Sequence, residues 1–393
     1  MIEFGYVCSE CGREYAITPE LMVCPSCSGE QRSARPLRGV LEVGLVGALD
    51  GAWDVLDRLP VERRFFPAIP VGGTPLWAPQ HLRDELGYPN LFIKDDTLNP
   101  TASLKDRASF LVAAFARKHG IRDIVVASTG NAASSMAGVG AAAGLRVTSF
   151  VPRTAPRAKM VQSLQYGARV VPVDGNYDLA FELSLEYART RGYLSRNTAY
   201  NPLTIEGKKT AALEIYRQLG RAPDYVVVPV GDGVILAGVY KGFRDLRQLG
   251  LIDRVPVIYA AQAEGSSGIT RAFRSGDFDA AYSARTVADS ISVDVPRNGY
   301  HAVKQLREFG GRCVTATDEA ILGAQQRLAS STGLFAEPSA AAAFAGFLAS
   351  VKEIPHEATV VLLVTGSGLK DIDSAMRVVT LPERAVSRLD EIG

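Results

Sequence analysis

The feature of this sequence that most constrains its fold is a regular alternation of short apolar runs with helix-like runs after residue 120. Apolar runs at 124–127, 147–151 and 170–173 are each followed by a segment of helical character, the last of them at 177–191. Strands and helices that alternate at this spacing form a parallel sheet covered on both faces, with right-handed crossovers. Residues 120–199 are therefore predicted to form a small α/β domain.

A second alternating series follows, and we assign it with the segment before residue 120 to a larger domain, 36–119 and 200–393. A strand is expected at 91–93 and a helix at 108–118. Further strands are expected at 225–230, 257–261 and 359–364, and further helices at 206–219, 318–330 and 338–351. Residues 265–312 show little periodicity, so no element is predicted there. The fold class is α/β with mostly parallel sheets.

The first 35 residues differ from the rest because they contain four of the five cysteines. These form two Cys-x2-Cys pairs separated by 12 residues, Cys8 with Cys11 and Cys24 with Cys27. This arrangement is typical of two thiolate knuckles around a tetrahedral zinc ion. Four cysteine ligands leave no open position, so such a zinc would be structural. The alternative is a module that holds free thiols without a metal.

Composition indicates a cytoplasmic enzyme and gives no sign of a nucleic-acid or membrane partner. The 393 residues carry a net charge of +1, with 22% charged and 47% hydrophobic residues. Strictly apolar runs such as 360–364 fall far short of the roughly 18 residues that span a bilayer. The N-terminus has neither a basic region nor an apolar signal core.

Four polar or glycine-rich loops each directly follow a predicted strand or strand-like run. They span 99–105, 128–131, 231–233 and 365–368. Ligands of open α/β sheets gather outside the carboxyl ends of the strands. The four loops together therefore indicate one site.

The first loop places Lys105 where a strand ends and a helix begins. Ser103 is positioned to cap that helix, and Asp106 falls in its first turn. A lysine held there can form a Schiff base with a carbonyl if its surroundings lower its pKa. The simpler alternative is a solvated surface lysine.

The loop at 231–233 is suited to an anion. Gly231 and Gly233 let backbone N–H groups approach a ligand, and the helix that follows favours negative charge at its N-terminus. The spacing matches neither the dinucleotide fingerprint nor a P-loop, and a plain tight turn is the alternative. A carboxylate at Asp232 about 4 Å from a phosphate would cost about 4 kcal/mol. Its side chain is therefore expected to point away or be paired.

The other two loops offer neutral hydrogen-bonding groups. Ser128, Thr129 and Asn131 could bind a ring hydroxyl or a carboxylate, although Asn131 would also serve as a helix cap. Thr365 ends the last strand and could bond a heterocyclic nitrogen, or could be a turn residue. A Schiff-base lysine, a phosphate cradle, an amide and a hydroxyl together describe a pyridoxal 5'-phosphate site.

At these motifs the chain resembles the fold-type II pyridoxal-phosphate enzymes, and among them the threonine synthases. The resemblance covers nearly the whole chain through the motifs NPTASLKDR, STGNAAS, NPLTIEGKKT, PVGDGVILAG, FAEPSAAAA and LLVTGSGLKD. Several proteins similar to threonine synthase also carry an N-terminal four-cysteine ribbon. The resemblance implies two three-layer α/β/α domains with mostly parallel sheets behind a zinc ribbon, and a homodimer.

The resemblance also implies a role for each matching residue. Lys105 would form the Schiff base and move protons, and Asn131 would lie beside the cofactor's ring hydroxyl. Thr365 would face the pyridine nitrogen. The substrate carboxylate would lie within Ser128, Thr129 and Gly130, and the cofactor phosphate within Gly231, Asp232, Gly233, Val234, Ile235 and Leu236. The reaction implied converts O-phosphohomoserine and water to threonine and phosphate.

Two departures from the family pattern keep other reactions open. Thr204 stands where threonine synthases commonly have an arginine that grips the substrate phosphate, and one hydroxyl does not replace a bidentate cation. Lys159, Lys208 or Lys209 could compensate, although each is expected at the surface. The loop GDGVILAG is spaced as in amino-acid dehydratases. The alternatives are β-elimination on serine or threonine, β-replacement, and an inactive zinc-ribbon binding protein.

Overall fold

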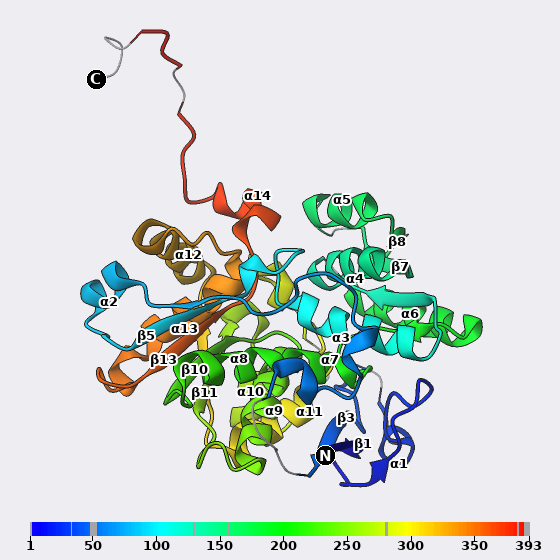
Figure 1. The fold of residues 1–393 in the computed structure, drawn as a ribbon. Coiled ribbons are helices and arrows are strands. Elements are labelled where there is room, and N and C mark those ends of the chain that lie inside the picture. Colours follow the sequence, from blue (N-terminus) through cyan, green and yellow to red (C-terminus); the bar gives the residue numbers. More distant parts are fainter. Residues whose placement is uncertain are drawn as a thin grey trace.

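The computed structural model describes residues 2–32, 34–47, 53–128, 130–153, 155, 157–279, 282–382 and 385–388 (Figure 1). Within these residues the largest sheet has six strands in the order β12-β11-β10-β13-β5-β4. Neighbouring strands are parallel except at the edge, where β4 runs antiparallel to β5. The strands are β4 (Leu76–Trp77), β5 (Leu91–Asp95), β10 (Tyr225–Pro229), β11 (Val257–Ala263), β12 (Arg312–Ala316) and β13 (Val360–Val364).

Helices cover both faces of this sheet because its central strands are apolar on both sides. Val227 and Leu362 pack into one core, with α2 (Gln80–Leu86), α12 (Asp318–Thr332) and α13 (Pro338–Ser350). Val226 and Val228 pack into the other core. Its helices are α8 (Thr210–Leu219), α9 (Val234–Gln248), α10 (Gly268–Ser275) and α11 (Gly299–Glu308). The result is a three-layer domain.

A second, four-stranded parallel sheet forms the smaller domain, in the order β8-β7-β6-β9. Its strands are β6 (Asp123–Ala127), β7 (Arg146–Pro152), β8 (Arg169–Val173) and β9 (Leu194–Ser195). One face packs against α6 (Tyr177–Arg191), and the other against α3 (Lys105–Lys118) and α4 (Asn131–Ala143). Helix α5 (Arg157–Gln165) lies beside α4. Because α3 leaves the large sheet and packs on the small one, its first residue lies between the two domains.

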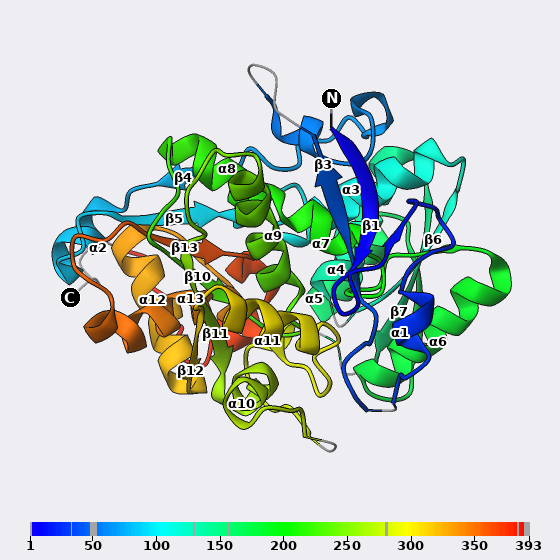
Figure 2. The same ribbon diagram turned by 90° about the horizontal axis from the view of Figure 1, so that it is seen from below.

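The N-terminal module is a small antiparallel sheet with the order β2-β1-β3 (Figure 2). Its strands are β1 (Glu3–Cys8), β2 (Glu14–Tyr15) and β3 (Leu41–Val46). Helix α1 (Pro25–Ser28) contains Cys27, and Cys24 is the residue that precedes it. Strand β3 joins the module to α9, since Arg244 donates to Glu42 at 2.8 Å and Gln248 to the Leu45 carbonyl at 2.8 Å. The sheet therefore takes its third strand from beyond the predicted boundary at residue 35.

The predicted fold class, two α/β/α domains with mostly parallel sheets behind a small N-terminal module, is confirmed. The helix predicted over 206–219 is instead two helices, α7 (Leu203–Lys208) and α8, which meet at Lys209. Residues 265–312, for which the sequence predicts no element, contain α10, α11 and a short 3-10 helix, Asp289–Ile291. In the described part of the chain the last helix is α14 (Ile372–Ala375).

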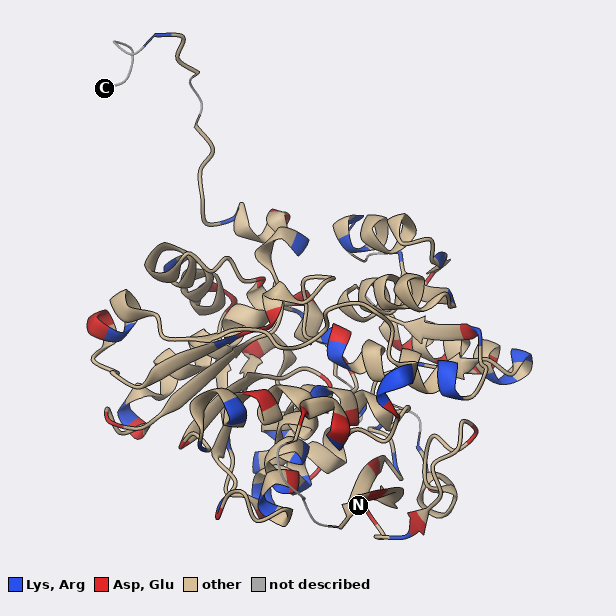
Figure 3. Ribbon diagram, viewed as in Figure 1, with Lys and Arg blue, Asp and Glu red and all other residues tan. Residues whose placement is uncertain are grey.

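Figure 3 shows basic and acidic residues intermingled on both domains, as expected for a net charge of +1. Among the described residues, no helix combines the length and the apolar character needed to cross a bilayer.

Candidate active site

The carboxyl ends of strands from both sheets meet at the first residue of α3, Lys105. The backbone brings the loops together directly: the Leu104 N–H donates to the Thr365 carbonyl at 2.9 Å, and Ser103 forms a bridge with Gly366. A cleft at this junction is lined by Lys105 and by residues of the small domain and of both sheets' loops. The lining residues are Lys105, Ala127, Ser128, Asn131, Ala132, Tyr177, Arg196, Thr198, Asp232, Asp289, Ser290, Ser292 and Val293.

The motif around Lys105 fixes the start of α3 through its charged neighbours. The buried Asp106 carboxylate accepts from the Thr101 N–H at 2.7 Å and from the Thr101 hydroxyl at 2.5 Å, which closes the loop before the helix. The prediction that Ser103 caps this helix is wrong. The residue before the helix is Leu104, and the buried Ser103 hydroxyl has no hydrogen-bond partner in the described part of the chain.

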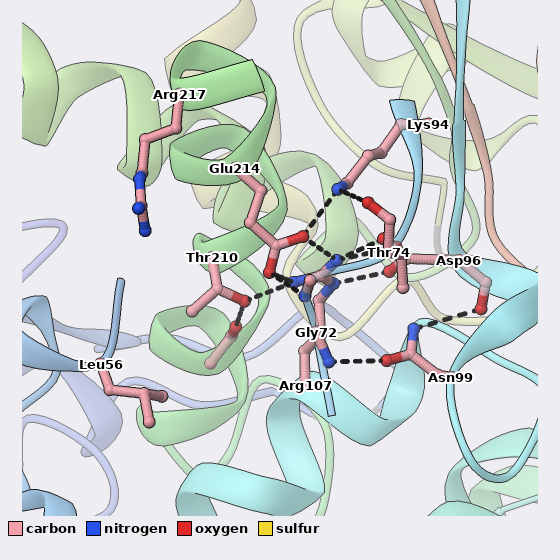
Figure 4. A network of polar contacts seen from close by, with 12 residues as sticks. Leu56, Gly72, Thr74, Lys94, Asp96, Asn99, Arg107, Thr210, Glu214 and Arg217 are labelled. Atoms are coloured by element: carbon pink, nitrogen blue, oxygen red, sulfur yellow. Dashed lines mark hydrogen bonds and ion pairs between the residues drawn. The ribbon is translucent and has the colours of Figure 1, made fainter. Parts of the chain in front are cut away.

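Arg107 anchors the helix to the large domain through a buried polar network (Figure 4). Its guanidinium donates to Asp96 at 2.6 and 2.8 Å and to Glu214 at 2.6 and 2.8 Å. Glu214 also accepts from Lys94 at 2.6 Å, and Thr74 donates to Asp96 at 2.7 Å. The network ties β5, α3 and α8 together, so Lys105 is mounted on a rigid helix start.

The surroundings of Lys105 favour the neutral amine that a Schiff-base nucleophile needs. Burial lowers the pKa of Lys105, and the charges of Arg196 and Lys159 add to this effect while Asp232 and Glu337 oppose it. The side chain is half-buried and opens on the cleft, so it is not a solvated surface lysine. A carbonyl compound in the cleft would meet a nucleophilic amine.

Asn131 is the first residue of α4, and its amide crosses the cleft instead of capping the helix. Its Nδ2 donates to the Ser290 hydroxyl at 3.0 Å and to the Glu337 carboxylate at 2.7 Å. Its Oδ1 is buried and has no partner among the described residues. An unpaired buried acceptor is costly, so this atom fits a ligand hydroxyl.

The loop after β6 is held against the buried lysine of α5. Ser128 accepts the Gly130 N–H at 3.0 Å, and a Cβ on Gly130 would lie 2.1 Å from Cδ of Lys159. Lys159 donates to Asp289 at 2.9 Å and to Ser290 at 3.0 Å, which links the small domain to residues 289–290. Thr129, assigned to substrate binding from the sequence, lies outside the described residues.

The loop after β10 forms a close-fitting cradle. A Cβ on Gly231 would lie 2.8 Å from Cα of Ile291, and Gly233 has φ +88, which favours glycine. Helix α9 begins at Val234, so Val234, Ile235 and Leu236 form its first turn. Asp232 faces the cleft and is paired: it accepts from the Thr198 hydroxyl at 2.6 Å and from the Val234 N–H at 2.9 Å.

Thr204 is not among the residues that line the cleft. It is fully buried in α7, and its hydroxyl donates to the Asn201 carbonyl at 2.7 Å, within its own helix start. The expectation that Lys159, Lys208 and Lys209 lie at the surface is wrong, because all three are buried. Tertiary packing of α5 and α7 against other helices covers them, which a local reading of the sequence does not reveal.

Several polar residues of the cleft were not predicted from the sequence. Arg196 is fully buried, and it donates to the Ser109 hydroxyl at 3.2 Å and to the Lys105 carbonyl at 3.3 Å. Tyr177, Thr198, Asp289 and Ser290 lie on segments with no recognisable site motif. Glu337, by contrast, belongs to the FAEPSAAAA motif, which singles out its segment.

The four N-terminal cysteines form a separate cluster. All four Sγ atoms lie within 4.8 Å of one another. The Cys8–Cys27 and Cys11–Cys24 sulfur pairs are each separated by 3.8 Å. Four Zn–S bonds of about 2.3 Å arranged as a tetrahedron would place the sulfur atoms about 3.8 Å apart. The cluster therefore has the dimensions of a four-cysteine zinc site.

The polar groups around the cleft are of the kinds that pyridoxal phosphate needs. It combines a lysine of lowered pKa, the unpaired Oδ1 of Asn131 and a glycine cradle at the N-terminus of α9. Thr365 is buried, and its carbonyl accepts from the N–H of Leu104, the residue before the lysine. A Cβ on the following Gly366 would lie 2.6 Å from Glu337 Oε1. A side chain added at Gly231 or Gly366 would thus displace the residues around the cleft.

Comparison with known proteins agrees with this chemistry. Residues 68–366 match the family described as "Pyridoxal-phosphate dependent enzyme". The threonine synthase of Methanosarcina acetivorans is 34% identical over 394 residues, covering 98% of this chain and 96% of that protein. The threonine synthase of Mycobacterium tuberculosis H37Rv is 35% identical over 345 residues, covering 86% of this chain and 94% of that protein.

Solved structures share the fold. A threonine deaminase from T.th. superposes with a TM-score of 0.65 at 26% identity, covering 75% of this chain and 92% of that one. Maize serine racemase superposes with a TM-score of 0.67 at 22% identity, covering 77% and 91%, and supports the fold alone. The chain belongs to the family of pyridoxal-phosphate-dependent enzymes, as its motifs predict.

Proposed function

We propose that this chain is a threonine synthase, a lyase that converts O-phosphohomoserine and water to threonine and phosphate. The observation that carries the proposal is Lys105, held at the junction of four loops with a lowered pKa and facing an unpaired amide oxygen of Asn131. Relatives at 34–35% identity over 86–98% of the chain, named threonine synthase, support the substrate.

The residues of the cleft divide the work of holding the cofactor. When bound, pyridoxal phosphate supplies an electron sink for charge that develops at the substrate's α-carbon. Lys105 would attach it, Asn131 Oδ1 would accept from its ring hydroxyl, and the loop 231–236 would hold its phosphate through backbone N–H groups. The Thr365 hydroxyl would face its ring nitrogen. A neutral partner there leaves that nitrogen without a positive charge and moderates the sink.

Lys105 would also carry the protons of the reaction. With the cofactor and substrate bound, the Lys105 amine would be the group that takes protons from the substrate's α- and β-carbons. A lowered pKa favours the neutral amine that a general base requires. The Ser128–Gly130 turn would hold the substrate carboxylate with the Ser128 hydroxyl and backbone N–H groups, so that the α-proton stays aligned with Lys105.

For the N-terminal module we propose one structural zinc ion bound by Cys8, Cys11, Cys24 and Cys27. The sulfur separations of 3.8 Å support a tetrahedral site. Zinc would stabilise the short sheet of the module, which packs on α9 and has little core of its own. A homodimer and a cytoplasmic location stay predictions from the resemblance and the sequence.

A second reaction on the same cofactor is favoured by one observation. Thr204 occupies the position of the phosphate-gripping arginine, and its hydroxyl is committed to the Asn201 carbonyl. A β-elimination on serine or threonine would need no site for a phosphate group on the substrate. The structural likeness at 26% identity to a protein named threonine deaminase is consistent with this alternative.

A substrate screen separates the two reactions. Purified protein loaded with pyridoxal phosphate is incubated with O-phosphohomoserine, with serine and with threonine, while phosphate, ammonia and threonine are measured. We expect phosphate and threonine in equal amounts from O-phosphohomoserine, and no product from Lys105→Ala. Ammonia from serine or threonine, without phosphate release, would refute the threonine synthase assignment.

A further inference from the structure

Three buried lysines lie in segments that could supply the charge missing at Thr204, and only one of them is free to do so. Lys209 pairs with Glu206 at 2.5 Å and with Asp245 at 2.7 Å. Lys159 pairs with Asp289 at 2.9 Å and with Glu337 at 3.6 Å. Lys208 is 1% exposed, and its Nζ has no hydrogen-bond partner in the described ranges of the chain.

Lys208 is directed toward the cleft from the side of α9. A Cβ on Gly238, in the second turn of α9, would lie 2.6 Å from the Cβ of Lys208, so the two helices touch there. The charges that act most strongly on Lys208 are those of Lys105, Arg196 and Asp232, all of which line the cleft. Its amino group is therefore close to the charged residues of the cleft, although Lys208 itself is not among the residues that line it.

The position of Lys208 on its own helix relates it to Thr204. The two residues are four apart in α7, so their side chains lie on the same face, one turn from each other. A cation at 208 thus reaches the same side of α7 as the arginine that the family has at 204. Both residues are fully buried, and neither is among the residues that line the cleft, so Lys208 would act from behind its wall.

The charge of Lys208 is not compensated by a direct partner in the described part of the structure. Arg196 hydrogen-bonds to a hydroxyl and a carbonyl, and among the described residues it makes no ion pair. Of the three charged groups that act most strongly on Lys208, two are the basic Lys105 and Arg196 and one is the Asp232 carboxylate. Glu337 and Asp106 are further carboxylates that act on Lys105 and Arg196, respectively. Burial, with the charges of Lys105 and Arg196, lowers the pKa of Lys208 well below its ordinary value. A buried cationic group without a partner is unfavourable unless an anion is bound.

We propose that Lys208 is the cationic anchor of a phosphate-monoester site in this cleft, with Arg196 as its second cation. A phosphate monoester carries about 1.5 to 2 negative charges near pH 7, so it would stabilise the protonated form of Lys208 and give Arg196 an anionic partner. Lys208 also offsets the repulsion between Asp232 and such a group. Two phosphate monoesters reach this cleft under the proposed function: the cofactor's 5'-phosphate and the phosphate of the substrate. Only the second source rests on the proposed function.

The first experiment measures cofactor affinity directly, without turnover. Apoprotein of the wild type, Lys208→Met and Lys208→Arg is titrated with pyridoxal phosphate and with pyridoxal, which lacks the phosphate, and binding is followed by absorbance. Lys118→Met, at the far end of α3, removes the same charge from the surface and serves as the control. Lys208→Gln replaces Lys208→Met if the latter does not fold.

If the cofactor's phosphate is the ligand, Lys208→Met weakens pyridoxal phosphate binding about tenfold to a hundredfold and leaves pyridoxal binding within twofold. Lys208→Arg restores most of the affinity, and the control does not change it. If the substrate's phosphate is the ligand, cofactor affinity stays constant. Calorimetric titration of the cofactor-loaded enzyme with inorganic phosphate then shows weaker binding by a similar factor.

A loss of affinity that is equal for pyridoxal phosphate and pyridoxal overturns the proposal, because it would act through Lys105 and not through a phosphate. So does the absence of any change in both titrations. A melting temperature of the Lys208→Met apoprotein at or above the wild-type value is expected, since an unpaired buried amine has been removed. If the enzyme uses serine or threonine and not O-phosphohomoserine, the proposed function fails while the cofactor titration still decides the role of Lys208.

Discussion

Replacement of Arg107 by methionine tests whether the buried network under Lys105 holds the two domains' junction. Arg107 makes four hydrogen bonds to the carboxylates of Asp96 and Glu214, at 2.6 to 2.8 Å. Asp96 would keep only neutral partners such as Thr74, and Glu214 would keep Lys94. Removal of one partner from a buried ion pair typically costs about 3–5 kcal/mol. We expect a loss of this size in the free energy of unfolding at pH 7.

The pH dependence of stability tests the part of this network that involves Glu214. Burial alone would raise the pKa of Glu214, but Arg107 and Lys94 lower it from 4.5 to about 2. Such a shift corresponds to about 3 kcal/mol of stability, from about 1.4 kcal/mol for each pKa unit. Because the pKa is lower in the folded state, this contribution is complete above about pH 4.5 and is lost as the pH falls toward 2.

The assay is urea unfolding of the apoprotein at several pH values between 7 and about 3.5, followed by circular dichroism. Arg146→Met is the matched control, since Arg146 donates to Asp123 at 2.7 Å in the same two-pronged manner but is 69% exposed. The control should lose no more than about 1 kcal/mol. For Arg107→Met the loss should be largest at pH 7 and should narrow below about pH 4.5. A loss no larger than that of the control, or one that does not narrow in acid, would refute the reasoning.

Three further changes test other parts of the site and of the module. Asn131→Ala removes the unpaired Oδ1 and should weaken pyridoxal phosphate binding about tenfold; it also removes the bonds to Ser290 and Glu337 and should lower the melting temperature of the apoprotein. Unchanged affinity in an absorbance titration would exclude contact with the ring hydroxyl. Gly231→Ala places a Cβ 2.8 Å from the Ile291 backbone and should lower both the cofactor affinity and the melting temperature. A cofactor affinity equal to that of the wild type would show that the backbone at Ile291 can move to make room for the methyl group. Cys24→Ser should reduce bound zinc from about one ion per chain and lower the melting temperature; metal analysis that finds no zinc in the wild type would contradict the proposed site.

Much of the architecture follows from local patterns in the sequence. Short apolar runs such as 225–230 predict buried parallel strands, and the loops after them meet because the carboxyl ends of parallel strands share one edge. The apposition of Lys105 with Thr365 follows from this rule. The rule does not extend to Arg196, which follows the short strand β9 without a motif or a clear period.

The missed features depend on contacts between distant segments. Lys208 and Lys209 have the composition of a surface stretch, and only the packing of α7 against α3 and α9 buries them. Ser103 suits a helix cap by type, but the bridge between Ser103 and Gly366 sets its backbone, and its hydroxyl makes no cap. In each case tertiary structure overrides a local preference.

The central claim is that Lys105 is the residue to which pyridoxal phosphate is attached. The most direct test is to load the protein with the cofactor, reduce it with borohydride, digest it and locate the modified lysine by mass spectrometry. We predict a single modified site at Lys105, and loss of both the label and the yellow absorbance in Lys105→Ala. A label on Lys208, the buried neighbour whose pKa is also lowered, or on no lysine at all, would contradict the account.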